Sequence, residues 1–307
     1  MCVAEPAVAD AAGIAASIHA ATCRARRCAI ARQALPAATA ALPGDRHAHA
    51  YPSFRHRHRR FVRHRPGTGK LAASDGYDLL IAADRPLAQA SAMLQGLGAQ
   101  VTAVETDLAT PGGLRELLAA LDTRSVDALF ANAGHGLGGA FLDQQPQQIQ
   151  HVIDTNVSGT VALLHAIGNR MRTAGRGRIL ITGSIAGFEP GSYQAVYNAT
   201  KAFVDSFALA VRDELKDSGV TVSCLMPGVT DTDFFERAGM LDTKLAAGRK
   251  MDPAEVARIG YDAMNRGEAD VIAGWRNKLE VAMASLTSDE RLAAKHAKVA
   301  RPGSARQ

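Results

Sequence analysis

The stretch Tyr197-Asn198-Ala199-Thr200-Lys201 decides how this sequence is interpreted, because it sets a phenol and an amine four residues apart. The apolar residues that follow, between 202 and 211, recur with the period of a half-buried helix. On such a helix, side chains at this spacing share one face, with their Cβ atoms about 5–6 Å apart. We therefore expect both groups to be rigidly placed and able to act on one substrate atom.

Tyr197 and Lys201 have complementary chemistry. A phenol with an ordinary pKa of about 10 is a poor base at neutral pH, and a nearby ammonium group favours the phenolate. General acid–base catalysis works best when the pKa of the catalytic group lies near the operating pH. Lys201 is thus expected to make Tyr197 a usable acid and base. Isolated pairs of this kind usually lie on ordinary surface helices, so the interpretation depends on the neighbouring motifs.

Ser184 follows a predicted buried strand at 178–183. In open parallel sheets, ligands bind outside the carboxyl ends of the strands. The Ser184 hydroxyl is therefore well placed to hydrogen-bond the oxygen that Tyr197 protonates. Two further predicted strands also end in distinctive turns, namely 127–131 before Asn132-Ala133-Gly134 and 220–226 before Pro227-Gly228.

Taken in order, these motifs resemble the short-chain dehydrogenase/reductase family over about residues 71 to 275. The resemblance implies a doubly wound parallel α/β sheet of the Rossmann type. It also implies an oxidoreductase that moves hydride between NAD(P) and a carbonyl or secondary alcohol. The matching motifs are Asp107-Leu108 after a strand, the Asn132-Ala133-Gly134 turn, Asn156 within a helix, Ser184, Tyr197 with Lys201, and Pro227-Gly228 followed by Thr230 and Thr232.

The resemblance also implies a role for each matched residue. Tyr197 is the expected acid and base, and Lys201 serves both the phenol and the cofactor ribose. Asn156 would hold a water in a proton relay, although a buried polar residue bonded to backbone is the alternative. The expected catalytic set is Ser184, Tyr197, Lys201 and Asn156, and the expected cofactor-binding set adds Asp107 and Leu108 near the adenine, Asn132 and Gly134 along the cofactor, and Thr230 and Thr232 at the nicotinamide carboxamide.

Asp84 ends the second predicted strand of the sheet, at 77–83. An acid at this position can accept hydrogen bonds from the adenosine ribose, and it repels a 2′-phosphate. We therefore expect NAD or NADP as cofactor, with NAD slightly favoured. Arg85 could instead pair with the phosphate, and Asp84 could simply cap the following helix.

Predicted strands and helices alternate from Leu71 onward, which indicates a parallel sheet covered on both faces. A terminal helix with a loose tail is expected after residue 275. The predicted strands lie near 77–83, 101–105, 127–131, 178–183, 220–226 and 270–273, and the predicted helices near 86–97, 111–122, 145–174, 194–217 and 253–266.

Residues 1–70 differ in composition from the rest of the chain. They contain eleven arginines and one lysine against three acids, a net charge of +9, so residues 71–307 carry −4 of the total of +5. Such a block can be a nucleic-acid arm, and five histidines between 47 and 64 can suggest metal binding, but neither interpretation is favoured. We expect three regions, namely a segment outside the family pattern at 1–70, the dinucleotide-binding and catalytic domain at 71–275, and a C-terminal helix and tail at 276–307.

A glycine-rich loop of the pattern T-G-x-x-x-G-x-G, which holds the cofactor pyrophosphate in this family, is missing. Its expected place is occupied by His58-Arg59-Arg60-Phe61-Val62-Arg63-His64-Arg65, and residues 45–70 show no strand or helix signal. Read one nucleotide later, the codons of those eight residues permit Thr-Gly-Ala-Ser-Ser-Gly-Ile-Gly. We therefore predict that the first strand and the glycine loop are lost to a frameshifted N-terminus. The alternative function is a non-catalytic relative that keeps the fold.

The remaining expectations concern location and partners. No apolar run approaches the roughly 20 residues that a membrane span needs, and no basic signal-peptide start is present. We expect a cytoplasmic protein with a small-molecule carbonyl or alcohol substrate, and no nucleic acid, membrane or metal partner. The long helices at 145–174 and 194–217 are expected to pair subunits into a homo-oligomer, either a dimer or a tetramer.

Overall fold

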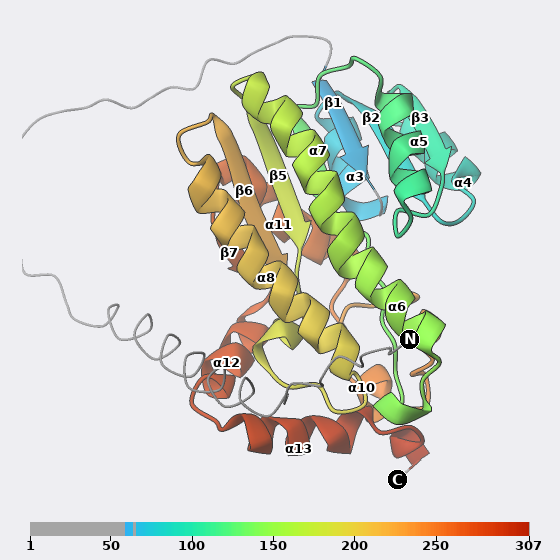
Figure 1. The fold of residues 1–307 in the computed structure, drawn as a ribbon, viewed down its shortest axis with the longest axis vertical. Helices are drawn as coiled ribbons and strands as arrows, with labels where there is room; N and C mark the ends of the chain where they lie inside the picture. Colours follow the sequence, from blue (N-terminus) through green and yellow to red (C-terminus); the bar gives the residue numbers. More distant parts are fainter. Residues whose placement is uncertain (1–58, 64–65, 307) are drawn as a thin grey trace, which may run out of the picture. The chain divides into compact units, whose positions relative to one another are not determined.

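A seven-stranded parallel sheet forms the centre of the protein (Figure 1). The computed structural model describes residues 59–63 and 66–306, and all of these lie within one unit, Arg55–Gln307. The strand order is β3-β2-β1-β4-β5-β6-β7, with every neighbouring pair parallel. The strands are β1 (Arg59–Arg63), β2 (Tyr77–Ala83), β3 (Val101–Glu105), β4 (Ala128–Ala131), β5 (Gly177–Thr182), β6 (Val220–Met226) and β7 (Asp270–Ile272).

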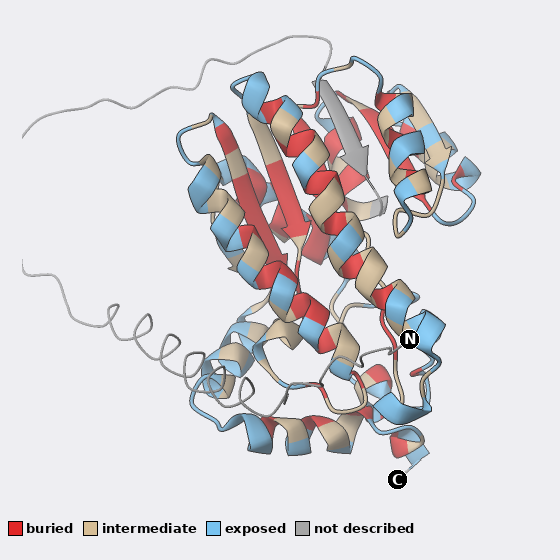
Figure 2. Cartoon of the chain, in the orientation of Figure 1, coloured by how far each residue is buried: buried red, intermediate tan, exposed pale blue. Residues whose placement is uncertain are grey.

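Helices cover both faces of this sheet, as the alternating sequence pattern predicts. The central strands carry near-continuous apolar runs, because parallel strands are buried on both sides; Figure 2 shows β5 and β6 as largely buried. Two separate apolar cores result, one on each face. Helices α5 (Pro111–Leu121), α7 (Gly159–Thr173) and α8 (Ala195–Leu215) pack on one face, and α3 (Pro66–Ser74), α4 (Ala88–Gln95) and α11 (Pro253–Arg266) on the other.

The helix expected at 145–174 is interrupted. It consists of α6 (Pro146–Ile153), a π-helical turn η2 (Asp154–Ser158) and α7. A Cβ on Gly159 would overlap the backbone carbonyl of Leu108, so only glycine fits where this turn meets the loop after β3. Turns of the π type are often found at functional sites, and this one carries Asn156.

The centre of the sheet differs from the sequence-based expectation. We expected no strand or helix between residues 45 and 70, but β1 pairs with both β2 and β4, and α3 begins at Pro66. Each flanking strand has a row of backbone donors and acceptors that need hydrogen-bond partners. The extended segment Arg59–Arg63 provides these partners. The strand position that we expected to be lost is therefore filled. The reading frame of this segment is a property of the gene and stays a prediction.

The C-terminal region forms two helices instead of one helix and a loose tail. These are α12 (Trp275–Ala284) and α13 (Asp289–Ala300), beyond the carboxyl ends of the strands in the lower part of Figure 1. On α13, Leu292, His296 and Ala300 are buried. The His296 ring contacts the carbonyl of Ser192 through Nδ1 at 2.8 Å. Two short helices complete this end, α9 (Phe234–Arg237) and α10 (Lys244–Ala247).

Several sequence features fall outside the described residues. They include the tract of five histidines between 47 and 64, and Cys2, Cys23 and Cys28. Cys224 is described and is buried in β6, where burial raises the pKa of its thiol. Within 59–63 and 66–306, no helix combines the length and apolar character needed to cross a membrane.

Candidate active site

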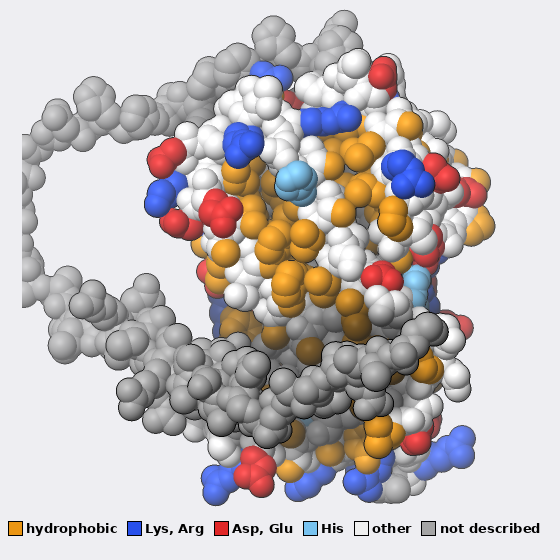
Figure 3. Space-filling view, viewed as in Figure 1, with side chains coloured by type: hydrophobic (Ala, Val, Ile, Leu, Met, Phe, Trp, Pro, Cys, Tyr) orange, Lys and Arg blue, Asp and Glu red, His pale blue; other side chains and the backbone are white. Residues whose placement is uncertain are grey.

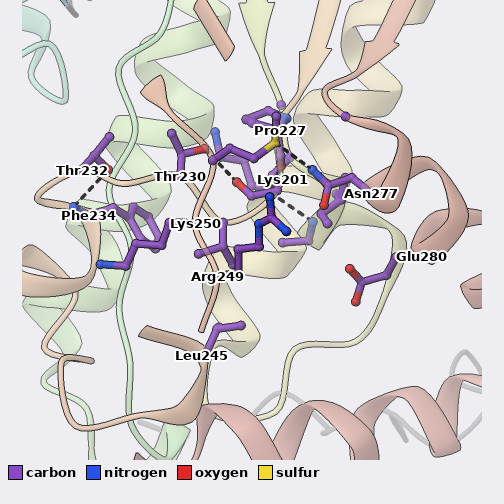
Figure 4. Close-up of a pocket in the computed structure, with 18 of the residues that line it drawn as sticks. Lys201, Pro227, Thr230, Thr232, Phe234, Leu245, Arg249, Lys250, Asn277 and Glu280 are labelled. Atoms are coloured by element: carbon purple, nitrogen blue, oxygen red, sulfur yellow. Dashed lines mark hydrogen bonds between the residues drawn. The ribbon is translucent and has the colours of Figure 1, made fainter. Parts of the chain in front are cut away.

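A cavity of about 680 Å³ opens at the carboxyl ends of β5 and β6 (Figure 4). Its floor comes from the strand ends and α8, and its walls come from the segment between β6 and α11 and from the two C-terminal helices. Seven of the predicted site residues line it, namely Asn132, Gly134, Ser184, Tyr197, Lys201, Thr230 and Thr232. The sequence motifs therefore meet around one cavity, as ligand sites in open α/β sheets do.

Tyr197 and Lys201 lie on the first two turns of α8, facing the cavity. The Lys201 Nζ is 6.0 Å from the centroid of the Tyr197 ring, and it donates a hydrogen bond to the Thr182 carbonyl at 2.8 Å. Lys201 is only 5% exposed, so its ammonium group acts in a weakly solvated environment. The Tyr197 ring also lies 5.0 Å from the Phe234 ring. The pair is thus held between the end of β5 and α9.

Ser184 sits where β5 ends and the 3-10 helix η3 (Ile185–Phe188) begins. Its Oγ accepts a hydrogen bond from the Ala186 N–H at 3.1 Å, which caps η3, and it donates to the Pro227 carbonyl at 3.4 Å. Its own N–H donates to Asp205 Oδ1 at 3.2 Å. These contacts fix the backbone of Ser184 from three sides and keep the hydroxyl at the edge of the cavity.

Asn156 is buried and fully engaged with its surroundings. Its Oδ1 accepts a hydrogen bond from the His135 N–H at 2.8 Å, while its Nδ2 donates to the His135 carbonyl at 3.0 Å and to Thr200 Oγ1 at 2.9 Å. The side chain therefore ties the loop after β4 to α8. These contacts are those of the backbone-bonded alternative, and the proton-relay role of Asn156 stays a prediction.

The expected nicotinamide side of the site is lined by backbone and hydroxyl groups. A Cβ on Gly134 would lie 3.5 Å from Lys201 Nζ, so the loop after β4 comes close to the Tyr197–Lys201 pair. Thr230 Oγ1 donates to the Gly228 carbonyl at 3.0 Å, and Thr232 Oγ1 accepts from the Phe234 N–H at 3.3 Å. Figure 4 shows both threonines on the segment that leads to α9.

The remaining predicted cofactor residues, Asp84, Asp107 and Leu108, lie outside this cavity. Asp107 accepts a hydrogen bond from the Ala109 N–H at 2.9 Å and so shapes the turn after β3. Asp84 is paired with Arg237 of α9 at 2.7 Å. The structure thus divides the predicted site residues into a group around the cavity and a group at the ends of β2 and β3.

A second ion pair accompanies the first. Arg85 NH1 lies 3.0 Å from Asp233 Oδ2, so two neighbours at the end of β2 are paired with two residues of the α9 segment. Arg237 also contacts His135 Nδ1 at 3.4 Å. Burial, followed by the positive charge of Arg237, lowers the pKa of His135. The α9 segment is therefore attached by charge to the strand end where an adenosine would be recognised.

The family follows from these motifs and from a direct match. A model of the family described as short chain dehydrogenase matches residues 67–240, which is more than half of the chain. The chain belongs to the short-chain dehydrogenase family. Its match begins within α3 and ends just past α9, so it includes every residue of the cavity group.

Individual short-chain dehydrogenases resemble this one at moderate identity. An uncharacterized oxidoreductase of Myxococcus xanthus is 32% identical over 218 residues, covering 67% of this chain and 82% of that protein. A short-chain dehydrogenase from Sphingobium yanoikuyae, solved in complex with NADPH, is 27% identical with a TM-score of 0.65, covering 75% of this chain and 96% of the other. A bulky-bulky ketone specific alcohol dehydrogenase from Comamonas testosteroni is 25% identical with a TM-score of 0.63, covering 74% and 93%.

The residues of this short-chain dehydrogenase fit the nicotinamide half of NAD(P) better than the adenosine half. Gly134, Thr230 and Thr232 line the part of the cavity beside Lys201. A larger residue at position 134 would narrow that space. By contrast, Asp84 is engaged by Arg237, and only residues 64 and 65 separate β1 from α3. The sequence from β1 to α3 also lacks the T-G-x-x-x-G-x-G pattern that would hold the pyrophosphate.

The structure also brings in residues that the motifs did not identify. Asp205 is one helical turn after Lys201, and an acid on the buried face of a predicted helix was a signal that could have found it. Burial raises the pKa of Glu189, which lines the cavity opposite the C-terminal helices. No motif pointed to the part of the cavity wall that α12 and α13 form, because these helices lie beyond the matched region. The residues of this wall are Trp275, Arg276, Asn277, Glu280, Lys295, His296 and Val299.

Proposed function

We propose that this protein is an NAD(P)-dependent oxidoreductase that interconverts a carbonyl and a secondary alcohol. Tyr197 gives a proton to the carbonyl oxygen or takes one from the alcohol. Lys201 stabilises the phenolate, Ser184 hydrogen-bonds the same substrate oxygen, and Asn156 holds the loop after β4 in place. The bound nicotinamide cofactor supplies or accepts the hydride.

One observation carries this proposal, namely that Ser184, Tyr197 and Lys201 border the same cavity although η3 and the loop before α8 separate Ser184 from the other two in sequence. An acid–base group is useful only within reach of the reacting oxygen. The buried ammonium of Lys201 near the phenol ring favours the charged form of the phenol. Residues with this geometry and this chemistry are suited to proton transfer at one oxygen atom.

We also propose a substrate that is bulky and apolar next to its carbonyl. Phe234, Leu245, Trp275 and Val299 line the cavity, and its volume of about 680 Å³ lies in the range of small-molecule sites. The relative from Comamonas testosteroni is an alcohol dehydrogenase specific for bulky-bulky ketones. Apolar walls of this kind favour a substrate whose own apolar surface is removed from water on binding.

For the cofactor, we propose a slight preference for NAD over NADP. The carboxylate of Asp84 at the end of β2 would repel a 2′-phosphate and could accept hydrogen bonds from a ribose. It must leave Arg237 to do so, and Arg85 must stay with Asp233. Both ion pairs are partly exposed, so neither is a large barrier.

Specific observations also favour a second candidate, a non-catalytic relative that keeps the fold. The glycine loop is absent, β1 and α3 are separated by two residues, and Asp84 is already paired. Titrating the purified chain with NADH and NADPH, followed by cofactor fluorescence, separates the two candidates. Saturable binding together with turnover of a bulky ketone supports the oxidoreductase. Binding of neither cofactor, even by a version of the chain that carries the glycine loop, supports the non-catalytic relative.

We propose that two copies of the chain associate through the face formed by α7 and α8. Figure 3 shows hydrophobic side chains gathered over these helices. Phe203 and Leu209 of α8 are 43% and 41% exposed, and the Phe203 ring stacks on Phe207 at 5.7 Å. Large exposed apolar patches are typical of interaction sites. Sedimentation velocity on the wild type and on Phe203→Ser tests this, because a monomeric wild type contradicts it.

A further inference from the structure

Asp205 is a buried acid on α8 that the proposed chemistry does not use. It is 8% exposed and does not line the cavity. Its Oδ1 accepts the hydrogen bond from the Ser184 N–H at 3.2 Å, and the Cys224 thiol lies 3.7 Å from the same oxygen. Its Oδ2 accepts no hydrogen bond from any residue between 66 and 306. The shorter of the two hydrogen bonds to this carboxylate thus comes from the backbone of a proposed catalytic residue.

Two glycines close around the same carboxylate. A Cβ added to Gly183 would overlap Asp205 Oδ1, and a Cβ added to Gly187 would overlap Asp205 Oδ2. These glycines flank Ser184 on either side, at the end of β5 and in η3. The backbone at Gly183 and Gly187 therefore packs directly against the Asp205 carboxylate, which lies between α8 and the Ser184 segment.

Burying the charged carboxylate of Asp205 costs free energy, which argues that its hydrogen bond to the Ser184 N–H matters. Lys201, one turn earlier on α8, is the cation that acts on Asp205, and Cys224 of β6 is the other titratable group beside it. Burial outweighs the attraction of Lys201 and raises the pKa of Asp205 to about 6. An apolar residue such as the neighbouring Val204 would pack here without that cost, but it could not accept the Ser184 N–H.

We propose that Asp205 is a positioning residue that clamps the Ser184 segment to α8. Because Tyr197 lies on the same helix, the clamp fixes the separation between the Ser184 hydroxyl and the Tyr197 phenol. A displacement of about 1 Å in a catalytic group can cost on the order of a hundredfold in rate. The catalytic consequence rests on the proposed function, whereas the clamp itself does not.

Amide hydrogen exchange tests the clamp without any turnover. Exchange in peptides covering residues 182–188 is compared for the wild type, Asp205→Ala, Asp205→Asn and the control Val204→Ala. Asp205→Ala should speed exchange at Ser184 by about tenfold or more, the factor expected for losing a hydrogen bond to a charged acceptor. Asp205→Asn keeps an acceptor oxygen and should stay near wild type, as should Val204→Ala. Unchanged protection in a folded Asp205→Ala variant would overturn the clamp.

A double-mutant cycle tests the same geometry through thermal stability, and it needs Asp205→Ala only to keep a measurable unfolding transition. Gly183→Ala places a methyl group on the carboxylate and should lower the melting temperature strongly in the Asp205 background. In the Asp205→Ala background the obstructing oxygen is gone, so the same change should cost much less. Additive effects of the two substitutions would mean that the carboxylate does not lie against Gly183, and would overturn the proposal.

Turnover distinguishes the clamp from the proposed reaction. With an active chain, Asp205→Ala should lower kcat about tenfold or more, while the cofactor Kd changes by less than about twofold. The reason is that the Asp205 carboxylate contacts Ser184 and does not line the cavity. Asp205→Asn should recover most of kcat. Equal losses in both variants, or a loss in cofactor binding alone, would contradict a positioning role. A wild type without turnover counts against the proposed function, and exchange then decides on the clamp.

Discussion

The guanidinium of Arg237 on α9 lies 2.7 Å from the carboxylate of Asp84 at the end of β2, across 153 positions of sequence. Neighbouring Arg85 and Asp233 repeat the arrangement at 3.0 Å. The segment over the cavity is therefore fastened to the strand end that would recognise the adenosine. If Asp84 binds the cofactor ribose as proposed, an incoming cofactor must compete with Arg237 for it, and this competition can be measured.

Releasing Asp84 should improve NAD binding. In Arg237→Gln the carboxylate loses its charged partner and is free to accept hydrogen bonds from a ribose. The pair is about a third exposed, so its loss is worth at most about 1 kcal/mol and NAD affinity should rise by about fivefold or less. The control is Arg176→Gln, which breaks an ion pair with Asp127 at 3.3 Å. Calorimetric NAD affinities that fall in Arg237→Gln would show that Arg237 itself binds the cofactor.

Asp84→Ser should shift the cofactor preference from NAD(H) towards NADP(H). The substitution removes the negative charge that repels a 2′-phosphate while Arg85 and Arg237 remain. Comparison of kcat/KM for both cofactors, with Asp127→Ser as the control, measures the shift. A wild type that already prefers NADP(H) would show that the two arginines outweigh Asp84.

Tyr197→Phe should abolish turnover while cofactor affinity stays within a few-fold, because it removes a transferable proton and little volume. Tyr193→Phe is a matched control, since Tyr193 lies four residues earlier and does not line the cavity. Lys201→Ala should damage both rate and cofactor binding. Steady-state rates should be measured in this chain and in a version that carries the glycine loop. Normal turnover of Tyr197→Phe would exclude it as the acid and base.

The stability of the protein should depend on the ionisation of Asp205. Burial raises its pKa from 3.8 to about 6 in the folded state, so the folded protein binds this proton more tightly than the unfolded chain. Its contribution to stability is therefore full below about pH 4 and is lost as the pH rises through about 6. About two pKa units correspond to roughly 3 kcal/mol. Urea unfolding of the wild type and Asp205→Asn between pH 4 and 8 should show the wild type losing about this much relative to the variant. A constant difference would contradict the raised pKa.

The nucleotide sequence across codons 45 to 71 tests the origin of the N-terminal segment. We propose that residues 1 to about 70 are translated from the wrong frame, so that the proposed oxidoreductase activity belongs to the in-frame protein and the chain as written is inactive. The hidden glycine loop requires G in the third position of the codons for Arg59, Arg63 and Arg65. Any other base there refutes it. A protein with Thr-Gly-Ala-Ser-Ser-Gly-Ile-Gly in place of residues 58–65, preceded by the shifted-frame strand, should bind NAD far more tightly, and tight binding by the present chain would refute the prediction.

The catalytic candidates Tyr197, Lys201 and Ser184 could be proposed from sequence because their signals are local. A helix fixes the spacing of Tyr197 and Lys201, and a strand that ends on Ser184 places its hydroxyl at the edge of a parallel sheet. Such constraints depend on a few neighbouring residues. Buried strands such as β6 were equally visible, since a strand covered on both faces carries an unbroken apolar run.

β1 was missed because its sequence, Arg-Arg-Phe-Val-Arg, lacks the apolar run of a central parallel strand. Its place is set by its neighbours, β2 and β4, whose backbone groups need partners. The π-helical turn at Asn156 was missed for a related reason. The turn forms where the helix packs against the loop after β3, and no residue of the turn indicates a change from the α-helical to the π-helical period.

The sequence by itself determined the doubly wound fold, the order of most of its elements and the catalytic candidates, because helix and strand periodicity and strand-end motifs are written in adjacent residues. Only the tertiary structure decided which distant groups meet. It set Arg237 on Asp84, closed Gly183 and Gly187 around Asp205, and brought α12 and α13 to the wall of the cavity. Such contacts depend on how distant segments of the chain pack together. The charge and volume of the side chains decide them, and no fixed spacing in the sequence reveals them.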